Sequence, residues 1–213
     1  MGTSPNVAPP HPRRHIKAVL AAVILVSLCI GQGAAVAQQV VLHEEDPGQG
    51  GKRFVGSAIW RTDMVKPGPE QPPELAIRAD VEVPERKLIM SWALRRNSDK
   101  DLPASHAVEF MFKLPRDFAG GGVSNVAGML MKQGALTRGE PLAGLVVKVT
   151  PGFYVMGLSN RNAEKERNLH LLKDRGWFDI AIVYNNTRRA LLSLEKGARG
   201  EHVFAEAFAA WQQ

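Results

Sequence analysis

The chain has 213 residues, of which 45% are hydrophobic and 23% charged, with 20 glycines, 14 prolines, a single cysteine and a formal net charge of +6. This composition excludes a fibrous protein, a wholly disordered chain and a small disulfide-stapled domain. The length favours one folded domain over two small ones.

Residues 1–37 have the pattern of an export signal. Basic residues at positions 13, 14 and 17 precede the apolar stretch Ala18–Ile30, and Ala35-Val36-Ala37 has the alternating small residues that a signal peptidase accepts. Cleavage there leaves a mature chain that starts at Gln38, in the periplasm or secreted. The alternative is an uncleaved anchor in the inner membrane, since residues 18–37 carry no charge over about the span of a bilayer.

Removal of this signal changes the chemistry of the chain. The signal contains three of the 27 basic residues and no acidic one, so the net charge falls from +6 to +3. A nucleic-acid partner is therefore not indicated. Cys29, the only cysteine, leaves with the signal, so neither a disulfide nor a cysteine ligand is expected in the mature protein.

The next segment, residues 38–53, is predicted to be a flexible linker. The acidic residues 44–46 are followed by the Pro-Gly-Gln-Gly-Gly sequence of residues 47–51, which disfavours both helix and strand. We expect a single β-rich domain over residues 54–213. A proline-rich crossing at residues 67–73 leads into its first long strand.

Through most of the domain, apolar residues recur at every second position. Alternating apolar residues predict an antiparallel meander over 75–83, 88–94 and 108–114, with one face toward water. Residues 145–149 lead through a type II turn at 150–153 into a further strand, 153–158. In the strands predicted at 153–158, 178–184 and 190–194, the residues that face either side of the sheet are mostly apolar. Both faces of these strands are therefore expected to be covered by other parts of the chain.

Two helices are predicted in the C-terminal half. One begins at Ser159 or Asn160 and runs to Arg175, before Gly176. The other has the apolar stripe Phe204, Ala207, Phe208 and Trp211 at helical spacing. The fold class that follows is mainly β (α+β): an antiparallel β-sandwich with the two helices packed on the sheet, over its later strands.

Several segments resemble an exported bacterial domain family of unknown function. They are Arg95-Arg96-Asn97, Leu102–His106, Gly157–Asn160, Trp177–Ile180 and Glu195–Gly197. The resemblance covers roughly residues 54–211 and implies a location in the cell envelope. It implies no activity, cofactor or catalytic residue.

The sequence contains no catalytic or metal-binding motif. Ser159 lacks the second glycine of a nucleophile elbow and suits a helix cap. Asn97-x-Asp99-x-Asp101 resembles the start of a calcium loop, but Leu102 and Val108 replace its glycine and its glutamate. We therefore expect no catalytic residue, metal or cofactor.

Two polar loops, 97–106 and 120–125, are the places where we expect a ligand to bind, if any loop binds one. The candidate ligand-binding residues are Arg96, Asn97, Asp99, Asp101, His106, Ser124 and Asn125. A second hypothesis is that Arg96 or Arg188 pairs with a buried carboxylate or with the carboxylate of a ligand, because a guanidinium forms two parallel hydrogen bonds to a carboxylate. The alternative for both arginines is a place at the wet rim of the sheet.

The sequence thus predicts a non-enzymatic envelope domain that binds an envelope protein, a cell-wall component or itself through loops or a sheet edge. A hydrolase or small-ligand protein that uses loops 97–106 and 120–125 is the first alternative. A membrane-tethered accessory protein, with residues 18–37 uncleaved, is the second. The sequence does not predict the oligomeric state.

Overall fold

The computed structural model describes residues 1, 36–46, 48, 50–66, 71–99 and 102–212. The predicted signal or anchor, residues 1–37, lies outside these residues except for residues 1, 36 and 37, and so does Asp101. The elements are β1 (Gln38–Glu44), β2 (Lys52–Val65), β3 (Glu74–Val83), the 3-10 turn η1 (Pro84–Arg86), β4 (Leu88–Arg96), β5 (Ala104–Lys113), β6 (Val123–Lys132), β7 (Glu140–Pro141), β8 (Gly144–Thr150), β9 (Phe153–Ser159), α1 (Asn162–Asp174), β10 (Trp177–Tyr184), β11 (Arg189–Glu195) and α2 (Gly197–Ala210).

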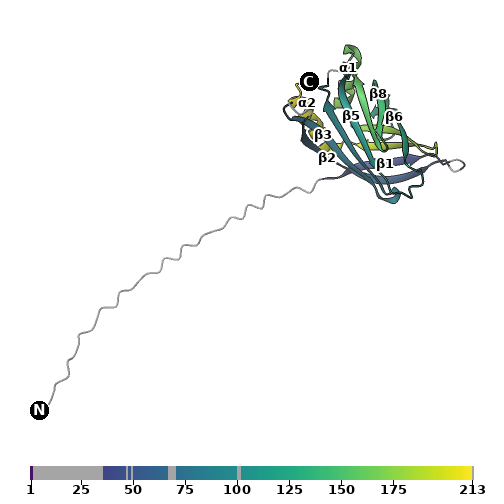
Figure 1. The fold of residues 1–213 in the computed structure, drawn as a ribbon, viewed down its shortest axis with the longest axis horizontal. Helices are drawn as coiled ribbons and strands as arrows, with labels where there is room; N and C mark the ends of the chain where they lie inside the picture. The colour runs from purple at the N-terminus through teal and green to yellow at the C-terminus, as the bar shows by residue number, and fades with distance from the viewer. Residues whose placement is uncertain (2–35, 47, 49, 67–70, 100–101, 213) are drawn as a thin grey trace. The chain divides into compact units, whose positions relative to one another are not determined.

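The strands form one antiparallel sheet in the order β7-β6-β10-β11-β1-β2-β3-β4-β5-β9-β8 (Figure 1). The mainly β, α+β class is confirmed, and the meander β3-β4-β5 pairs as expected, for example Ala79 with Trp92 and Trp92 with Phe110. The two packed sheets of a sandwich are not found among the described residues. Instead, a single sheet curls so that its inner face surrounds the core.

The two ends of the curled sheet are joined near the short segment between β7 and β8. The backbone N–H of Leu142 donates to Met129 O of β6 at 3.0 Å, and the N–H of Ser159, in β9, donates to Ala143 O at 2.9 Å. The Tyr154 hydroxyl, from β9, donates to Val123 O of β6 at 2.7 Å. Strands at opposite ends of the order therefore lie next to each other, and the inner face is enclosed.

Large aromatic side chains fill the inside of the curl. Trp60, Trp92 and Phe178 come from three different strands and are at most 1% exposed. The rings of Trp60 and Trp92 meet edge to face with centroids 5.4 Å apart, and Phe204 of α2 lies 5.5 Å from Trp60. Edge-to-face contacts of this kind add to the free energy of burial. The interior is therefore a packed core.

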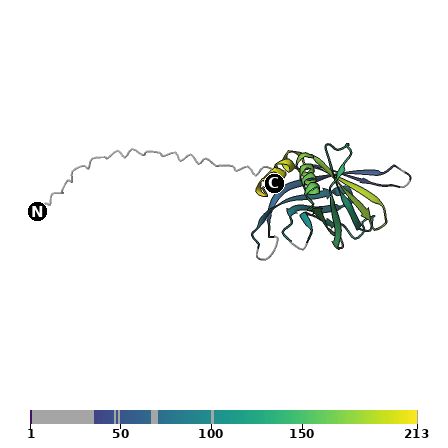
Figure 2. The same ribbon diagram turned by 90° about the horizontal axis from the view of Figure 1, so that it is seen from above.

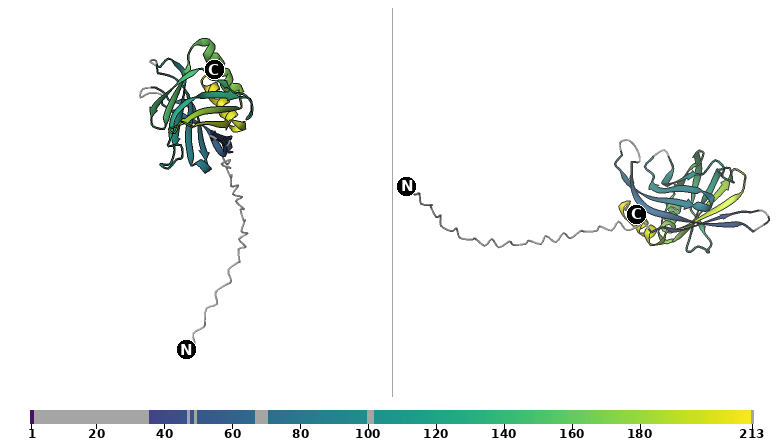
Figure 3. Two further views of the ribbon diagram at one scale, coloured as in Figure 1. Left: turned by 90° about the vertical axis from the view of Figure 1, so that its right-hand side faces the viewer. Right: turned by 90° about the horizontal axis from the view of Figure 1, so that it is seen from below.

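Helix α2 closes one end of this core. The predicted stripe Phe204, Ala207, Phe208 and Trp211 is at most 3% exposed. A glycine in the helix, Gly200, permits the close approach, because a Cβ at this position would lie 3.1 Å from the Trp60 ring. Figures 2 and 3 show α2 at the opposite end of the sheet from the β1–β2 hairpin.

The expected place of the helices over the later strands is confirmed for α1, which contacts β9, and is wrong for α2, which contacts early strands. α2 packs on β2 and β3, and α1 packs on β9 and α2. The Asn168 side chain fastens α1 to the segment between β7 and β8, since its amide donates to Ala143 O and its carbonyl accepts from Ala143 N, both at 2.8 Å. The bounds of α1 agree with the prediction to within three residues at its start.

The linker prediction for residues 38–53 is wrong. Gln38–Glu44 forms β1 in the middle of the sheet, between β11 and β2, and its Val40 and Leu42 are fully buried. The glycines that suggested a linker instead make the β1–β2 turn, in which Gly48, Gly50 and Gly51 all have positive φ. The folded domain therefore includes residues 38–53.

Candidate functional site

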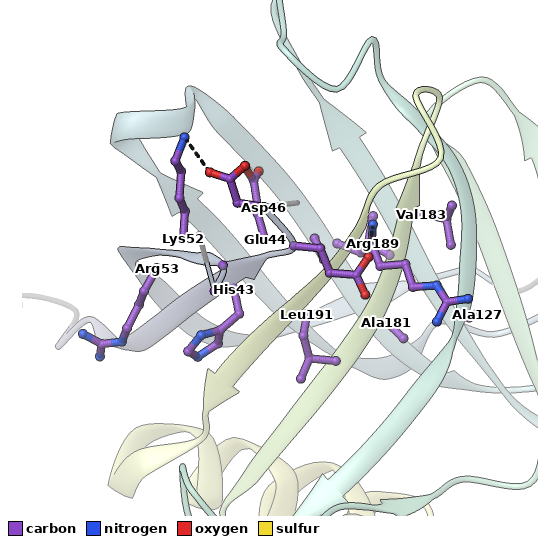
Figure 4. A pocket seen from close by; sticks show the side chains of 15 residues that line it. His43, Glu44, Asp46, Lys52, Arg53, Ala127, Ala181, Val183, Arg189 and Leu191 are labelled. Atoms are coloured by element: carbon purple, nitrogen blue, oxygen red, sulfur yellow. Dashed lines mark hydrogen bonds and ion pairs between the residues drawn. The ribbon is translucent and has the colours of Figure 1, made fainter. Parts of the chain in front are cut away.

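A groove lies on the outer face of the sheet. It has a volume of about 1000 Å³ and lies where the β1–β2 hairpin meets β11, β10 and β6 (Figure 4). The hairpin extends beyond the neighbouring strands, as Figure 2 shows, so its side chains form one wall. The groove is thus a product of the hairpin that was predicted to be a linker.

The floor of the groove is apolar. Ala127, Ala181, Val183 and Leu191 line it from three strands. In β10 and β11 these residues alternate with inward-facing ones such as Leu192, so Ala181, Val183 and Leu191 face outward. Ala127 is exposed and the other three are partly buried. A short patch of aliphatic side chains is therefore open to solvent between charged walls.

An arginine side chain lies on each side of this floor. Figure 4 shows Arg53 on the hairpin side and Arg189 on the opposite side, with Leu191 and Ala181 between them. Among the described residues, neither guanidinium takes part in a hydrogen bond or an ion pair, and both residues are exposed. Two cationic groups are therefore available to an anionic partner.

The acidic residues of the wall are engaged within the chain. The Asp46 carboxylate forms ion pairs with Lys52 at 3.0 Å and with Arg188 at 3.3 Å. Arg188 also donates to the backbone carbonyl of Glu45 at 2.8 Å. The carboxylate that Arg188 pairs with belongs to the hairpin and is only partly buried, so the predicted pairing with a buried or ligand carboxylate is not what the structure shows. These contacts hold the hairpin against the start of β11.

A buried ion pair lies on the same outer face as the groove floor. The Lys132 amine is 2.8 Å from the Asp179 carboxylate, and both side chains are at most 8% exposed. Ser193 donates to the same carboxylate at 2.5 Å. A buried ion pair is stable only when the remaining hydrogen-bonding capacity of its two groups is satisfied. Lys132 meets part of this requirement, because its amine also donates to Ala135 O at 2.7 Å.

His43 lies at the edge of the groove, close to this pair. Its pKa is lowered from 6.5, first by burial and then by the positive charge of Arg53, with Asp179 acting in the opposite direction. The imidazole is therefore neutral near pH 7, and it can accept one hydrogen bond and donate another.

The base of the hairpin is anchored by a second buried network. Glu44, 6% exposed, accepts from the Tyr184 hydroxyl at 2.8 Å and from Arg86 at 3.0 Å. The Arg86 guanidinium lies between the rings of Phe54 and Phe118, 5.2 and 5.0 Å from their centroids. Burial and the Glu44 carboxylate raise the pKa of Tyr184 above its usual range. The hairpin is thus fixed in place at its root.

The predicted ligand residues of loop 97–106 have structural roles. Arg96 binds Glu74 through two hydrogen bonds of 3.1 and 2.6 Å, so this arginine also pairs with a carboxylate of the chain. The Asn97 side-chain amide donates to three backbone carbonyls of its own loop, each at 2.9 Å. Asp99 is exposed, and its backbone N–H donates to Asn97 Oδ1 at 3.1 Å.

A shallow polar pocket of about 470 Å³ contains Arg96 and Asn97 but none of the other predicted residues. His106 is fully buried beneath it, with its ring centroid 5.3 Å from that of Trp211 and its Nδ1 3.2 Å from the Ser105 hydroxyl. The imidazole is therefore part of the core that faces α2.

The predicted residues of loop 120–125 lie elsewhere. Ser124 donates to the carbonyls of Val183 and Tyr184, both at 3.0 Å, and Asn125 is exposed on β6. Strand β9 passes near both loops. Its Tyr154 contacts β6 beside Ser124, and its Leu158, four residues further along, pairs with His106. Four residues of a strand span about 13 Å. The two loops therefore do not share a pocket.

The residues of the groove were missed because its wall was assigned to a linker. The available signal was the short apolar run of residues 40–42 between polar residues, which the proline and glycines of residues 47–51 outweighed.

Within the described residues, no three histidine, cysteine, aspartate or glutamate side chains cluster closely enough to hold a metal ion. None of the helices that the structure describes has the length and apolar character needed to cross a bilayer. Comparison with family models, with curated proteins and with solved structures gave no match for this chain.

Proposed function

We propose that this chain is a non-enzymatic binding module of the bacterial cell envelope, which holds an extended segment of a partner protein in the groove beside the β1–β2 hairpin. The observation that carries the proposal is the pair of unpartnered guanidinium groups, Arg53 and Arg189, on either side of an aliphatic floor. An envelope protein is the expected source of the segment.

The openness of the groove favours a polypeptide over a small molecule. Pockets for small ligands enclose most of the ligand surface. Here His43, Lys52, Arg53 and Arg189 are all exposed, so the walls surround only part of the space. An extended polypeptide needs no enclosure, because it covers the floor itself and leaves its outer side in water.

The charges favour an acidic segment with aliphatic residues. Asp46 is already neutralised by Lys52 and Arg188. The guanidinium groups of Arg53 and Arg189 form no ion pair in the described chain, although the Arg189 backbone N–H donates to the Glu45 carboxylate at 3.3 Å. A carboxylate on each side of one or two aliphatic residues would match these cations and the floor between them. Lys132 and Asp179 are already paired and would take no part.

The engagement of the other polar candidates supports a non-enzymatic role. Ser124 and Asn97 have hydrogen bonds to backbone carbonyls, and Arg96 has a carboxylate partner. None of these groups is held beside a general base in the way that a nucleophile requires.

Location in the envelope rests on residues 1–37 and on the family resemblance. N-terminal sequencing of the exported protein tests this part of the proposal. A start at Gln38 is the expected result, whereas retention of residues 18–37 in the membrane fraction would favour the tethered accessory protein.

Binding is tested by affinity capture from an envelope extract with the immobilised protein, followed by mass spectrometry. We expect a partner whose recovery falls about tenfold when Arg53→Glu and Arg189→Glu are combined, since two lost ion pairs and two new repulsions exceed about 1.4 kcal/mol. A photo-crosslinking amino acid at Leu191 should label the same partner, whereas one at Ile59, on the outer face of β2, should not.

The matched control is Arg138→Glu, which reverses the charge of another exposed arginine that has no ion pair among the described residues and does not line the groove. Equal loss of recovery in this control would mean that net charge, and not the groove, is recognised. Recovery that is unchanged in the double variant would refute the groove as the binding site.

A further inference from the structure

The strand at one end of the sheet, β8, is built differently from the strand at the other end. β7 has only two residues, one of them Pro141, which blocks pairing with a further strand. β8 has seven residues and pairs with β9 on one side. Among the described residues no strand is hydrogen-bonded to its other side, although β6 lies nearby. None of the residues of β8 lines the groove.

The outward row of β8 is aliphatic and open to water. Leu145, Val147 and Val149 are 80%, 62% and 53% exposed. The row continues across the outer face, because Val147 pairs with the partly buried Val155 of β9. Met111 of β5, 53% exposed, extends it further. Exposed edge strands normally carry charges, a proline or a covering element that prevents association, and β8 has one such residue, Lys148.

The sequence of β8 is complementary to itself when two copies run antiparallel. With Val147 opposite its own copy, Leu145 lies opposite Val149, so all three exposed aliphatic residues pair with aliphatic residues. The only charged residue, Lys148, then lies opposite Val146, and no like charges face each other. Lys148 already rests over the Tyr154 ring, 5.8 Å from its centroid.

We propose that two copies of this chain associate through β8, in antiparallel alignment about a two-fold axis at Val147. This contact is isologous and closed, so it yields a dimer and leaves no further β8 edge for growth. It lies apart from the groove, so each copy in the dimer keeps its own binding site.

Disulfide trapping tests the alignment directly. Opposed residues of antiparallel strands have Cα atoms about 4.5–5.5 Å apart, which falls within the range that a disulfide spans. In a full-length Cys29→Ser background, Val147→Cys should form a disulfide-linked dimer. Leu145→Cys and Val149→Cys should each crosslink poorly alone and efficiently when mixed.

The control is Val55→Cys, a valine that is 49% exposed on the outer face of β2. We expect Val147→Cys to crosslink about tenfold faster or more, because pairing raises the effective concentration of the two thiols. A rate equal to that of the control would overturn the proposed alignment.

Sedimentation velocity tests the association without cysteines. The unmodified protein should show a concentration-dependent dimer, and Val147→Lys should weaken it about tenfold or more, because it places two ammonium groups opposite each other. Val147 is exposed, so the variant should keep its melting temperature. A monomer at every concentration would refute the dimer, while capture of a partner through Arg53 and Arg189 would still stand.

Discussion

The amine of Lys196 makes the stability of this protein depend on pH in an unusual direction. Lys196 precedes α2, is fully buried, and lies with its Nζ 4.1 Å from the centroid of the Phe204 ring. Its Nζ donates to Leu172 O, near the end of α1. Burial lowers its pKa from 10.5 to about 7, and the more distant Glu201 and Asp174 carboxylates oppose this only in part.

The sign of the effect follows from the protons that each state binds. Between pH 7 and 10.5 the unfolded chain keeps the lysine proton, whereas the folded chain has lost it. Because the unfolded state binds more protons, the free energy of unfolding rises with pH, by about 1.4 kcal/mol per unit. Over the full interval the gain is at most about 5 kcal/mol, and it is lost again as the pH falls to 7.

Lys196→Met tests this reasoning, because methionine keeps the length of the side chain and removes the amine. The variant loses one hydrogen bond, about 1 kcal/mol, and no longer deprotonates an amine on folding, which costs the unmodified protein up to about 5 kcal/mol at pH 7. We therefore expect it to be more stable by about 2–4 kcal/mol at pH 7. By pH 10 the difference should disappear or reverse.

Urea unfolding followed by tryptophan fluorescence, at pH 7, 8, 9 and 9.5 and constant ionic strength, measures these quantities. Trp60 and Trp92 are fully buried, so unfolding should change their emission. Lys113→Met is the control, since Lys113 is exposed on β5, and it should keep the slope of the unmodified protein. A flat profile in the unmodified protein, or a Lys196→Met variant that is less stable at pH 7, would refute the argument.

Two further predictions concern the closure of the sheet and the root of the hairpin. Tyr154→Phe removes the hydroxyl that donates to Val123 O, so the free energy of unfolding should fall by about 1 kcal/mol in urea titrations, and an unchanged value would mean that this bond does not help to close the sheet. Glu44→Leu leaves the Arg86 guanidinium without its carboxylate and should cost about 3 kcal/mol by the same measurement. Restoration of stability by adding Arg86→Met would attribute that loss to the unpaired charge.

Local patterns predicted most of the strands and both helices. The strands at 75–83, 88–94, 178–184 and 190–194 have the expected alternation, and Gly152 has the positive φ that the turn at 150–153 requires. The inward rows were also predicted correctly, as the full burial of Trp92 and Phe110 shows. These features depend on residues close together in the chain.

Features that depend on distant residues could not be predicted in this way. β1 belongs to the sheet because Val40 meets Leu194, a residue near the other end of the chain. The groove was missed for the same reason, since Arg53 and Arg189 approach each other only through that pairing. The predicted covering of both faces of the strands at 153–158, 178–184 and 190–194 was also wrong in part, because outward residues such as Val155, Ala181 and Leu191 are only partly buried.

The central place of β1 has a consequence for how the chain reaches its fold. β1 is the first strand to be made, yet one of its two neighbours, β11, is next to last among the elements. Contacts between residues this far apart in sequence form slowly. During folding, the buried row Val40 and Leu42 therefore remains without its partner until β11 has been made, and in that interval the incomplete sheet offers β2 and β1 to any other extended chain.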